Sequence, residues 1–167
     1  MSPADLGLRV GLGFDVHAFG GDAPLVLGGV TIADGPGLIG HSDADVAAHA
    51  VADALLGAAG LPDLGTLFPA SDEHHRDASS MGLLCDVVTR VAAAGWSAVN
   101  VDVVIAAERP NLAEHVAAMA TNLGQAVGAP VNVKPKRGEG VGAIGRGEGI
   151  AAWAVALLST HESNPPS

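Results

Sequence analysis

Three polar side chains stand out in the sequence because their types and spacing suit metal chemistry. Asp15 and His17 lie two residues apart at the end of an apolar, glycine-containing run, and residues two apart on a strand project from the same face. His49 lies in an alanine-rich stretch, four residues after Asp45 and four before Asp53. This spacing places the three side chains along one face of a helix. That face is unexpectedly polar for a helix whose other residues are mostly apolar.

One carboxylate and two imidazoles form a good ligand set for a catalytic zinc ion with an open fourth position. On this interpretation Asp15, His17 and His49 bind Zn²⁺ or a similar divalent ion. Asp45 or Asp53 would then support a ligand or contact the substrate. The alternative is that Asp15 ends a turn, His17 is exposed and His49 is a core residue. Spacing alone does not decide between them, because it does not bring strand and helix together.

The composition limits the partners of the chain. Its 167 residues include 18 acidic and 8 basic side chains, which gives a formal net charge of −10. Such a surface repels nucleic acid, whose binding requires a basic stripe, so we expect no nucleic-acid partner. An acidic chain that handles phosphorylated small molecules needs metal ions or a few well-placed bases to offset its charge.

The composition also predicts the character of the core. Hydrophobic residues make up 49% of the chain but aromatic residues only 3%, so the core must be aliphatic and rich in alanine. Small side chains allow helices and sheets to approach closely, but each buries little area. Burial of a further face in an oligomer would therefore add stability.

Cys85 is the only cysteine in the sequence, which excludes an intrachain disulfide and a thiolate zinc cluster. Its apolar neighbours predict a buried, unreactive thiol. Residues 1–9 lack the pattern of a signal peptide. No apolar run approaches the roughly 20 residues of a membrane span. We therefore expect a cytoplasmic protein with no membrane partner.

Strand and helix patterns alternate along the chain, which predicts a single α/β or α+β domain over residues 1–160. The strand patterns occupy residues 8–14, 24–32 (as a hairpin), 99–105 and 131–133. The helix patterns occupy residues 42–59, 80–94 and 110–127. Ser42 and Asp45 have the spacing of a capping box, and Pro110 suits a first helical turn.

The C-terminal third is less regular. Residues 138–149 are rich in glycine and predict a loop. Residues 150–158 are apolar throughout, so periodicity does not decide between helix and strand. We expect residues 161–167 to form a disordered tail.

Several segments together resemble the signatures of one enzyme family. They are VGLGFDVH at residues 10–17, GHSDADVAAH at 40–49, DALLGAAG at 53–60, DLG at 63–65, LFP at 67–69 and GRGEGI at 145–150. In this order and at these intervals they are similar to the 2-C-methyl-D-erythritol 2,4-cyclodiphosphate synthases. The resemblance covers nearly the whole chain in one register.

The resemblance implies a mixed β-sheet covered by helices on one face, and a homotrimer with active sites between neighbouring subunits. The family's zinc ligands fall on Asp15, His17 and His49. Glu139 falls on the acid that holds a second divalent ion, Mg²⁺ or Mn²⁺, and Asp53 on a carboxylate close to the metal, which we interpret as catalytic. The family's substrate-binding and channel-mouth positions fall on His41, Ser42, Asp63, Leu64, Gly65, Phe68, Ala107, Pro110, Lys136, Arg137 and Arg146.

The implied reaction is intramolecular. The 2-phosphate of 4-diphosphocytidyl-2-C-methyl-D-erythritol 2-phosphate attacks the β-phosphorus, expels CMP and closes a cyclic diphosphate. The nucleophile is already anionic, so catalysis reduces to folding the substrate back on itself and neutralising charge. Zinc would polarise the attacked phosphate and the second ion would stabilise the departing CMP. Two divalent cations would also supply the positive field that the acidic chain lacks.

The chain departs from the family pattern at two places. Asn111 follows Pro110 where the family usually has Lys, and Lys136-Arg137-Gly138-Glu139 replaces the run Thr-Thr-x-Glu. One interpretation is that Lys136 and Arg137 bind phosphate, with Arg137 taking the catalytic place of a threonine. In a second, the chain binds a related nucleotide or diphosphate without cyclising it. In a third, both bases are solvated loop residues.

Two further functions fit parts of the pattern. A non-catalytic trimer that binds isoprenoid diphosphates or nucleotides would use Arg146 and Glu148, but it would leave the predicted zinc ligands without a purpose. A zinc phosphohydrolase would use the same ligands to activate water, with Asp53 as the nominated base. Metal content distinguishes the binding protein from the two enzymes, and the reaction product distinguishes the enzymes from each other.

Overall fold

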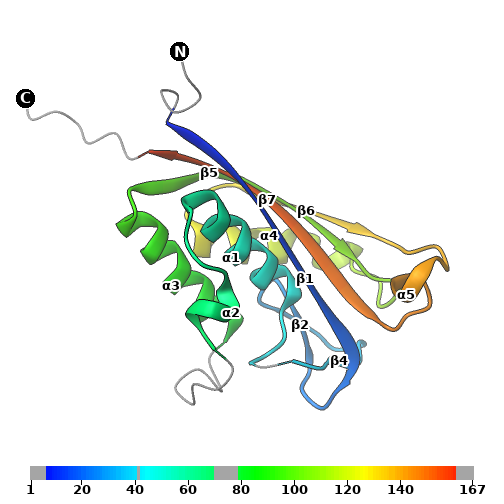
Figure 1. The fold of residues 1–167 in the computed structure, drawn as a ribbon. Coiled ribbons are helices and arrows are strands. Elements are labelled where there is room, and N and C mark those ends of the chain that lie inside the picture. The colour runs from blue at the N-terminus through cyan, green and yellow to red at the C-terminus, as the bar shows by residue number, and fades with distance from the viewer. Residues whose placement is uncertain (1–6, 41, 70–78, 161–167) are drawn as a thin grey trace, which may run out of the picture.

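The computed structural model describes residues 7–40, 42–69 and 79–160 (Figure 1). Its main sheet has five strands in the order β4-β1-β7-β5-β6. They are β1 (Leu8–Gly21), β4 (Gly37–Leu38), β5 (Trp96–Ala106), β6 (Val131–Lys136) and β7 (Gly149–Thr160). Only the β5–β6 pair is parallel among these neighbours, so the sheet is mixed. The strands β2 (Leu25–Leu27) and β3 (Val30–Ile32) form a separate hairpin.

Three longer helices cover one face of the main sheet (Figure 1). They are α1 (Val46–Ala59), α3 (Ser80–Ala93) and α4 (Val116–Val127), and shorter turns form α2 (Leu64–Leu67), η3 (Ala113–His115) and α5 (Gly142–Gly145). This arrangement confirms the predicted α/β class. In the described part of the chain, no helix combines the length and hydrophobicity needed to cross a bilayer.

The first strand extends further than the sequence pattern predicted, and the undecided segment 150–158 is a strand. β1 continues beyond Phe14 because it pairs with β7 from Leu8 to Ala18 and then with β4. Residues 150–158 form most of β7, which lies between β1 and β5 and is hydrogen-bonded to both. Buried Ala152, Ala154 and Ala156 alternate with exposed Trp153 and Val155 on β7, so both faces of the strand carry apolar residues and its periodicity is uninformative.

Both predicted helix starts at residues 42 and 110 were wrong. Ser42 has a φ of +59° and lies outside α1, so it forms no capping box. The N-cap of α1 is Asp45 itself. Pro110 follows a cis peptide bond, and α4 begins only at Val116, after the turn η3.

The predicted burial of Cys85 was also wrong. Its thiol is exposed on α3. The helix instead turns Leu84, Val87 and Val91 toward the core, and Cys85 lies on the opposite side of the same turns. Both faces of this helix contain apolar residues, so residue type alone does not identify the buried one.

Asp45 fixes the start of α1 from inside the protein. Its fully buried carboxylate accepts four backbone N–H bonds, from Gly28 and Gly29 at 2.9 and 2.8 Å and from Ala47 and Ala48 at 3.0 and 3.1 Å. Burial raises the pKa of Asp45, and these hydrogen bonds oppose that rise. Because the backbone uses both oxygens, Asp45 joins the β2–β3 turn to α1 and is not the metal-site acid that its spacing allowed.

α1 packs directly on β1 at two glycines. A Cβ atom added to Gly11 would lie 2.0 Å from the carbonyl oxygen of Ala54, and one added to Gly13 would lie 1.9 Å from that of Ala50. Both distances are well inside van der Waals contact, so only glycine permits this approach. The close contact sets the height of α1 above the strand.

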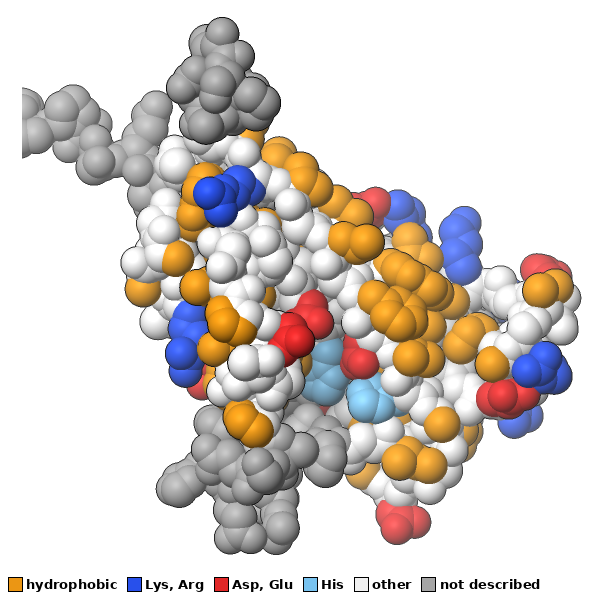
Figure 2. Space-filling view, viewed as in Figure 1, with side chains coloured by type: hydrophobic (Ala, Val, Ile, Leu, Met, Phe, Trp, Pro, Cys, Tyr) orange, Lys and Arg blue, Asp and Glu red, His pale blue; other side chains and the backbone are white. Residues whose placement is uncertain are grey.

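The opposite face of the sheet carries a stripe of exposed apolar side chains. Its members on β1 and β7 are between 39% and 67% exposed: Leu8, Val10, Leu12, Phe14, Val16, Trp153 and Val155. Figure 2 shows hydrophobic side chains following these strands across the molecule. The rings of Phe14 and Trp153 lie in contact in a tilted arrangement, with centroids 5.1 Å apart. A continuous apolar surface of this kind is typical of an interaction face.

We expect Gly13→Ala to lower the free energy of unfolding by about 3 kcal/mol or to prevent folding, because strand or helix must move. Gly57→Ala on α1 is the matched control, since its added methyl group meets nothing within 4 Å. Replacing glycine inside a helix should leave stability unchanged or raise it by about 0.5–1 kcal/mol. Chemical denaturation measures both variants, and equal stabilities would contradict the packing account.

Candidate metal centre and substrate pocket

Asp15 and His17 from β1 meet His49 from α1. Asp15 Oδ2 lies 2.9 Å from His49 Nδ1 and 3.1 Å from His17 Nε2. One ligand atom from each of the three residues lies within 4.8 Å of the others. Figure 2 shows histidine and carboxylate side chains gathered in a hollow beside the helices. The structure thus brings together the three residues that the sequence proposed as metal ligands.

The geometry of the cluster fits a four-coordinate ion. Ligand atoms about 2.0–2.2 Å from a tetrahedral zinc ion are about 3.3–3.6 Å apart. The two distances from Asp15 Oδ2, 2.9 and 3.1 Å, are close to that separation. The three side chains are mostly buried, at 14–25% exposed, so the cluster is not sealed from solvent. The donor set of two imidazoles and one carboxylate is typical of catalytic zinc.

Each histidine is held by a second contact on the side away from Asp15. His17 Nδ1 lies 2.7 Å from the carbonyl oxygen of Ile39, and because a carbonyl only accepts, Nδ1 carries the proton and Nε2 is free for a metal. His49 Nε2 lies 2.8 Å from Ser80 Oγ. Such contacts orient metal-binding imidazoles. Sequence reasoning missed both partners, since one is a backbone carbonyl and the other lies 31 positions from His49.

The electrostatics of the cluster favour a cation. Burial tends to raise the pKa of the Asp15 carboxyl, but hydrogen bonds and charges from His17 and His49 outweigh it and hold that pKa well below its ordinary value. The hydrogen bond to Asp15 raises the pKa of His17 above 6.5, although burial acts in the other direction. Asp15 is therefore ionised at neutral pH, with its negative charge at the centre of the cluster.

Asp53 lies one turn beyond His49 on α1. Its Oδ1 accepts the N–H of Leu64 at 2.8 Å, which ties α2 to α1. Burial raises the pKa of the Asp53 carboxyl, and the nearby charges of Asp63 and Asp15 add to the rise, while Leu64 and His49 oppose it. These influences put Asp53 within electrostatic reach of the cluster. Its predicted catalytic role remains a prediction.

The residues expected around the sugar phosphate form two groups. Asp63 is exposed and caps α2 by accepting the N–H of Thr66 at 2.7 Å, and Leu64 and Gly65 form the first turn of that helix. The side chain of Phe68 is 8% exposed and packs with the core. The Phe68 ring therefore serves the core, and the substrate-binding roles of Asp63, Leu64, Gly65 and Phe68 remain predictions.

Ser42 lies in the turn before α1, on the other side of the cluster. Its Oγ is 3.2 Å from Ser80 Oγ, so it is joined to the same hydroxyl that contacts His49. His41, which the sequence also proposed as a substrate contact, lies outside the described residues.

Four predicted substrate contacts from two distant segments line one cavity of about 150 Å³. They are Ala107, Pro110, Lys136 and Arg137, and Asn111, Leu112 and Pro135 complete the lining. The Ala107 N–H donates to the Lys136 carbonyl at 2.9 Å and joins the ends of β5 and β6. The Gly138 N–H donates to Glu108 Oε2 at 3.1 Å and holds the following loop.

The family of the chain follows from comparison with known proteins. The model of the YgbB family matches residues 8–159. The chain belongs to the YgbB family. It is 53% identical over 154 residues to the 2-C-methyl-D-erythritol 2,4-cyclodiphosphate synthase of Bordetella petrii, covering 90% of this chain and 95% of that one. Identity to the synthase of the same name from Rubrobacter xylanophilus is 55% over 158 residues, or 91% and 95% of the two chains.

Solved structures agree with this family membership. A 2C-methyl-D-erythritol-2,4-cyclodiphosphate synthase in a CDP-bound form matches with a TM-score of 0.83 at 35% identity, over 90% of this chain and all of that one. The bifunctional IspDF of Campylobacter jejuni matches with a TM-score of 0.87 at 40% identity, over 92% of this chain and 42% of the longer protein. The resemblance drawn from the sequence signatures is confirmed.

Two further family positions lie outside the cavity lining. Glu139, predicted to hold the second ion, is exposed on the loop after β6 with a φ of +51°. Arg146 follows α5, and its Nε donates to Glu148 Oε1 at 2.6 Å. Both members of this pair are more than half exposed. The ligand roles of Glu139 and Arg146 remain predictions.

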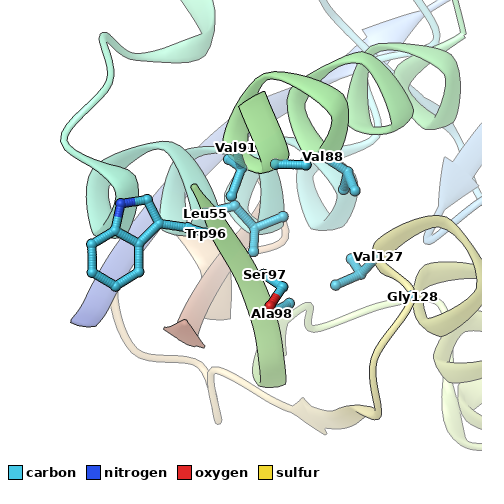
Figure 3. Close-up of a pocket in the computed structure, with 9 residues that line it drawn as sticks. Leu55, Val88, Val91, Trp96, Ser97, Ala98, Val127 and Gly128 are labelled. Carbon is cyan, nitrogen blue, oxygen red and sulfur yellow. The ribbon is translucent and has the colours of Figure 1, made fainter. Parts of the chain in front are cut away.

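A second cavity, of about 170 Å³, opens between α3, α4 and the start of β5 (Figure 3). Trp96, Leu55 and Val91 contribute to its mainly apolar lining. None of its lining residues is titratable, so they offer neither metal ligands nor charges for a phosphate. This YgbB-family chain therefore has its phosphate-binding candidates in the other cavity.

We expect Asp15→Ala, His17→Ala and His49→Ala each to abolish zinc binding, because each removes one of three protein ligands. Competition with a chromophoric zinc chelator measures the affinity. His115→Ala is the control, since that imidazole lies near Glu114 at 3.8 Å and outside the cluster, and it should bind zinc like the wild type. Near wild-type zinc binding by all three cluster variants would show that the ligands are elsewhere.

Proposed function

We propose that this YgbB-family chain converts 4-diphosphocytidyl-2-C-methyl-D-erythritol 2-phosphate into 2-C-methyl-D-erythritol 2,4-cyclodiphosphate and CMP. The reaction belongs to non-mevalonate isoprenoid precursor synthesis. The convergence of Asp15, His17 and His49 on one point carries the proposal, because these three residues can hold the metal ion that phosphoryl transfer requires. A role limited to nucleotide or diphosphate binding would leave that set unused and is not favoured.

In this proposal Asp15, His17 and His49 hold Zn²⁺, and Glu139 holds Mg²⁺ or Mn²⁺. Bound divalent ions supply positive charge that polarises the attacked phosphate and stabilises the departing CMP. The protein's own task is to fold the substrate so that its 2-phosphate reaches the β-phosphorus. Since that nucleophile is already ionised, Asp53 is needed to position groups at the centre and not as a strong base.

The cavity at the ends of β5 and β6 is proposed to receive the nucleotide. CDP-bound structures of related synthases support this assignment of the ligand class. Lys136 and Arg137 are exposed at the cavity, so both side chains can reach a bound phosphate. A guanidinium can bind phosphate through two parallel hydrogen bonds, which would replace the threonine contacts absent from this chain.

We also propose a homotrimer that buries the apolar stripe of β1 and β7. Seven large apolar side chains on one sheet face, up to 67% exposed, are costly to leave in water. The cavity lining includes none of the three metal-cluster residues, and β7 separates β1 from β5. An active site that combines the cluster of one subunit with the cavity of its neighbour is consistent with this separation. A cytoplasmic location remains a prediction from the sequence.

We expect Leu12→Glu to convert the trimer into monomers, because it places a charge at a position that is 67% exposed within the stripe. Sedimentation equilibrium measures the mass. Val99→Glu is the control, since Val99 is also exposed but lies at the β5 bulge outside the stripe. A trimeric Leu12→Glu protein, or a wild type that is monomeric at micromolar concentration, would contradict the proposed interface.

Phosphorus NMR of the protein with the cytidyl substrate, Zn²⁺ and Mg²⁺ tests the proposed reaction. We expect CMP and the cyclic diphosphate to appear together, and the His49→Ala protein to form neither. That result would also show that Arg137 is compatible with turnover. CMP with an open-chain product would indicate a phosphohydrolase, and unchanged substrate with zinc bound would indicate a binding protein.

A further inference from the structure

Ser80 connects the metal cluster to two other elements. It is the first residue of α3 and is 1% exposed. Its Oγ lies 2.8 Å from His49 Nε2 and 3.2 Å from Ser42 Oγ, and it donates to Asp43 Oδ1. The Ser80 N–H also points to the Asp43 carboxylate, at 3.2 Å from each oxygen. The carboxylate therefore holds both the backbone and the side chain of Ser80.

The number of protons available decides the direction of these bonds. A serine hydroxyl has one proton to donate and two lone pairs that accept. The Asp43 carboxylate accepts the proton of the Ser80 hydroxyl. The lone pairs of Ser80 Oγ then accept from Ser42 Oγ–H and from His49 Nε2–H. In this arrangement the single proton and both lone pairs of the Ser80 hydroxyl are used. His49 must then donate to Ser80 Oγ, so its proton lies on Nε2.

The opposite side of the His49 ring faces the metal cluster. Nδ1 lies 2.9 Å from Asp15 Oδ2. With one proton held on Nε2 by Ser80, the Nδ1 lone pair points at the cluster and can bind an ion directly. If Ser80 instead donated to Nε2, the imidazole would carry its proton on Nδ1 and present N–H to the ion. A neutral imidazole in that tautomer cannot bind metal through Nδ1.

We propose that Asp43 and Ser80 are positioning residues that hold His49 in the tautomer and orientation needed for metal binding. The inference rests on the proposed zinc site and extends it to two residues to which the sequence analysis gave no role. Because Ser42 shares the same hydroxyl, the hydrogen bonds also connect the metal ligand to the turn expected to contact substrate.

Zinc affinity in the absence of substrate tests the proposal without relying on turnover. Loss of a partner that orients a metal-binding histidine typically lowers metal affinity about 10–100-fold. We expect a loss of this size in Ser80→Ala, measured by chelator competition. Ser79→Ala is the matched control on the same helix, because it removes the N-cap bond to the Gly82 N–H and leaves Ser80 in place. Its zinc affinity should stay within about twofold of wild type.

Two additional measurements separate positioning from general damage to the fold. Asp43→Ala removes the carboxylate that accepts the Ser80 hydroxyl proton. That proton is then free to turn toward His49 Nε2, so this variant should also lower zinc affinity. Nitrogen-15 NMR of the zinc-loaded wild type should show a slowly exchanging proton on His49 Nε2. In Ser80→Ala that proton should exchange rapidly. If Ser80→Ala does not fold, Asp43→Ala and the wild-type spectrum still test the proposal.

Wild-type zinc affinity in either Ser80→Ala or Asp43→Ala would overturn the proposal, as would a His49 proton on Nδ1. An equal loss in Ser79→Ala would also overturn it, since helix destabilisation would then explain the effect. A wild-type chain that binds no zinc would instead overturn the proposed metal site. The two failures are therefore distinguishable.

Discussion

The contact between α1 and β1 determines where the metal centre can form. Gly11 and Gly13 have no side chain on the face that meets α1, and the carbonyl oxygens of Ala50 and Ala54 occupy the space that a Cβ would need. Asp15 follows Gly13 by two residues on the strand, and His49 directly precedes Ala50 on the helix. A helix held a few ångströms further away would separate the two ligands. The position of the candidate ligands thus depends on residues that contribute almost no side chain.

This packing has consequences elsewhere in the molecule. A core built from small residues buries little apolar area per residue, and the sheet leaves its other face covered only by exposed Leu, Val, Phe and Trp side chains. Oligomerisation through that face would recover the missing burial. The buried carboxylate of Asp45 accepts hydrogen bonds from four backbone N–H groups where the β2–β3 hairpin meets α1. Acidic residues therefore serve the fold at Asp45 and form part of the candidate metal centre at Asp15.

The sequence predicted those features whose signals are local. Two-residue spacing on one strand and a histidine on a polar helix face led to the candidate ligands that the fold brings together, and the family positions assigned to the nucleotide segments fall on four residues of the cavity lining. Features set by distant partners could not be read in the same way. The buried position of Asp45 depends on Gly28 and Gly29, which lie far from it in the sequence. The strand at residues 150–158 depends on pairing with β1 and β5. The contact between Ser80 and His49 joins α3 to α1. Cys85 was placed wrongly because α3 has apolar residues on both faces.

A crystal structure of the zinc-loaded protein, with anomalous scattering recorded at the zinc absorption edge, tests the account most directly. We expect zinc bound by the Asp15 carboxylate, His17 Nε2 and His49 Nδ1, at about 2.0–2.2 Å from each ligand atom. His17 Nδ1 should remain bonded to Ile39 and His49 Nε2 to Ser80. Zinc held through His49 Nε2, or an anomalous peak away from these three residues, would contradict it.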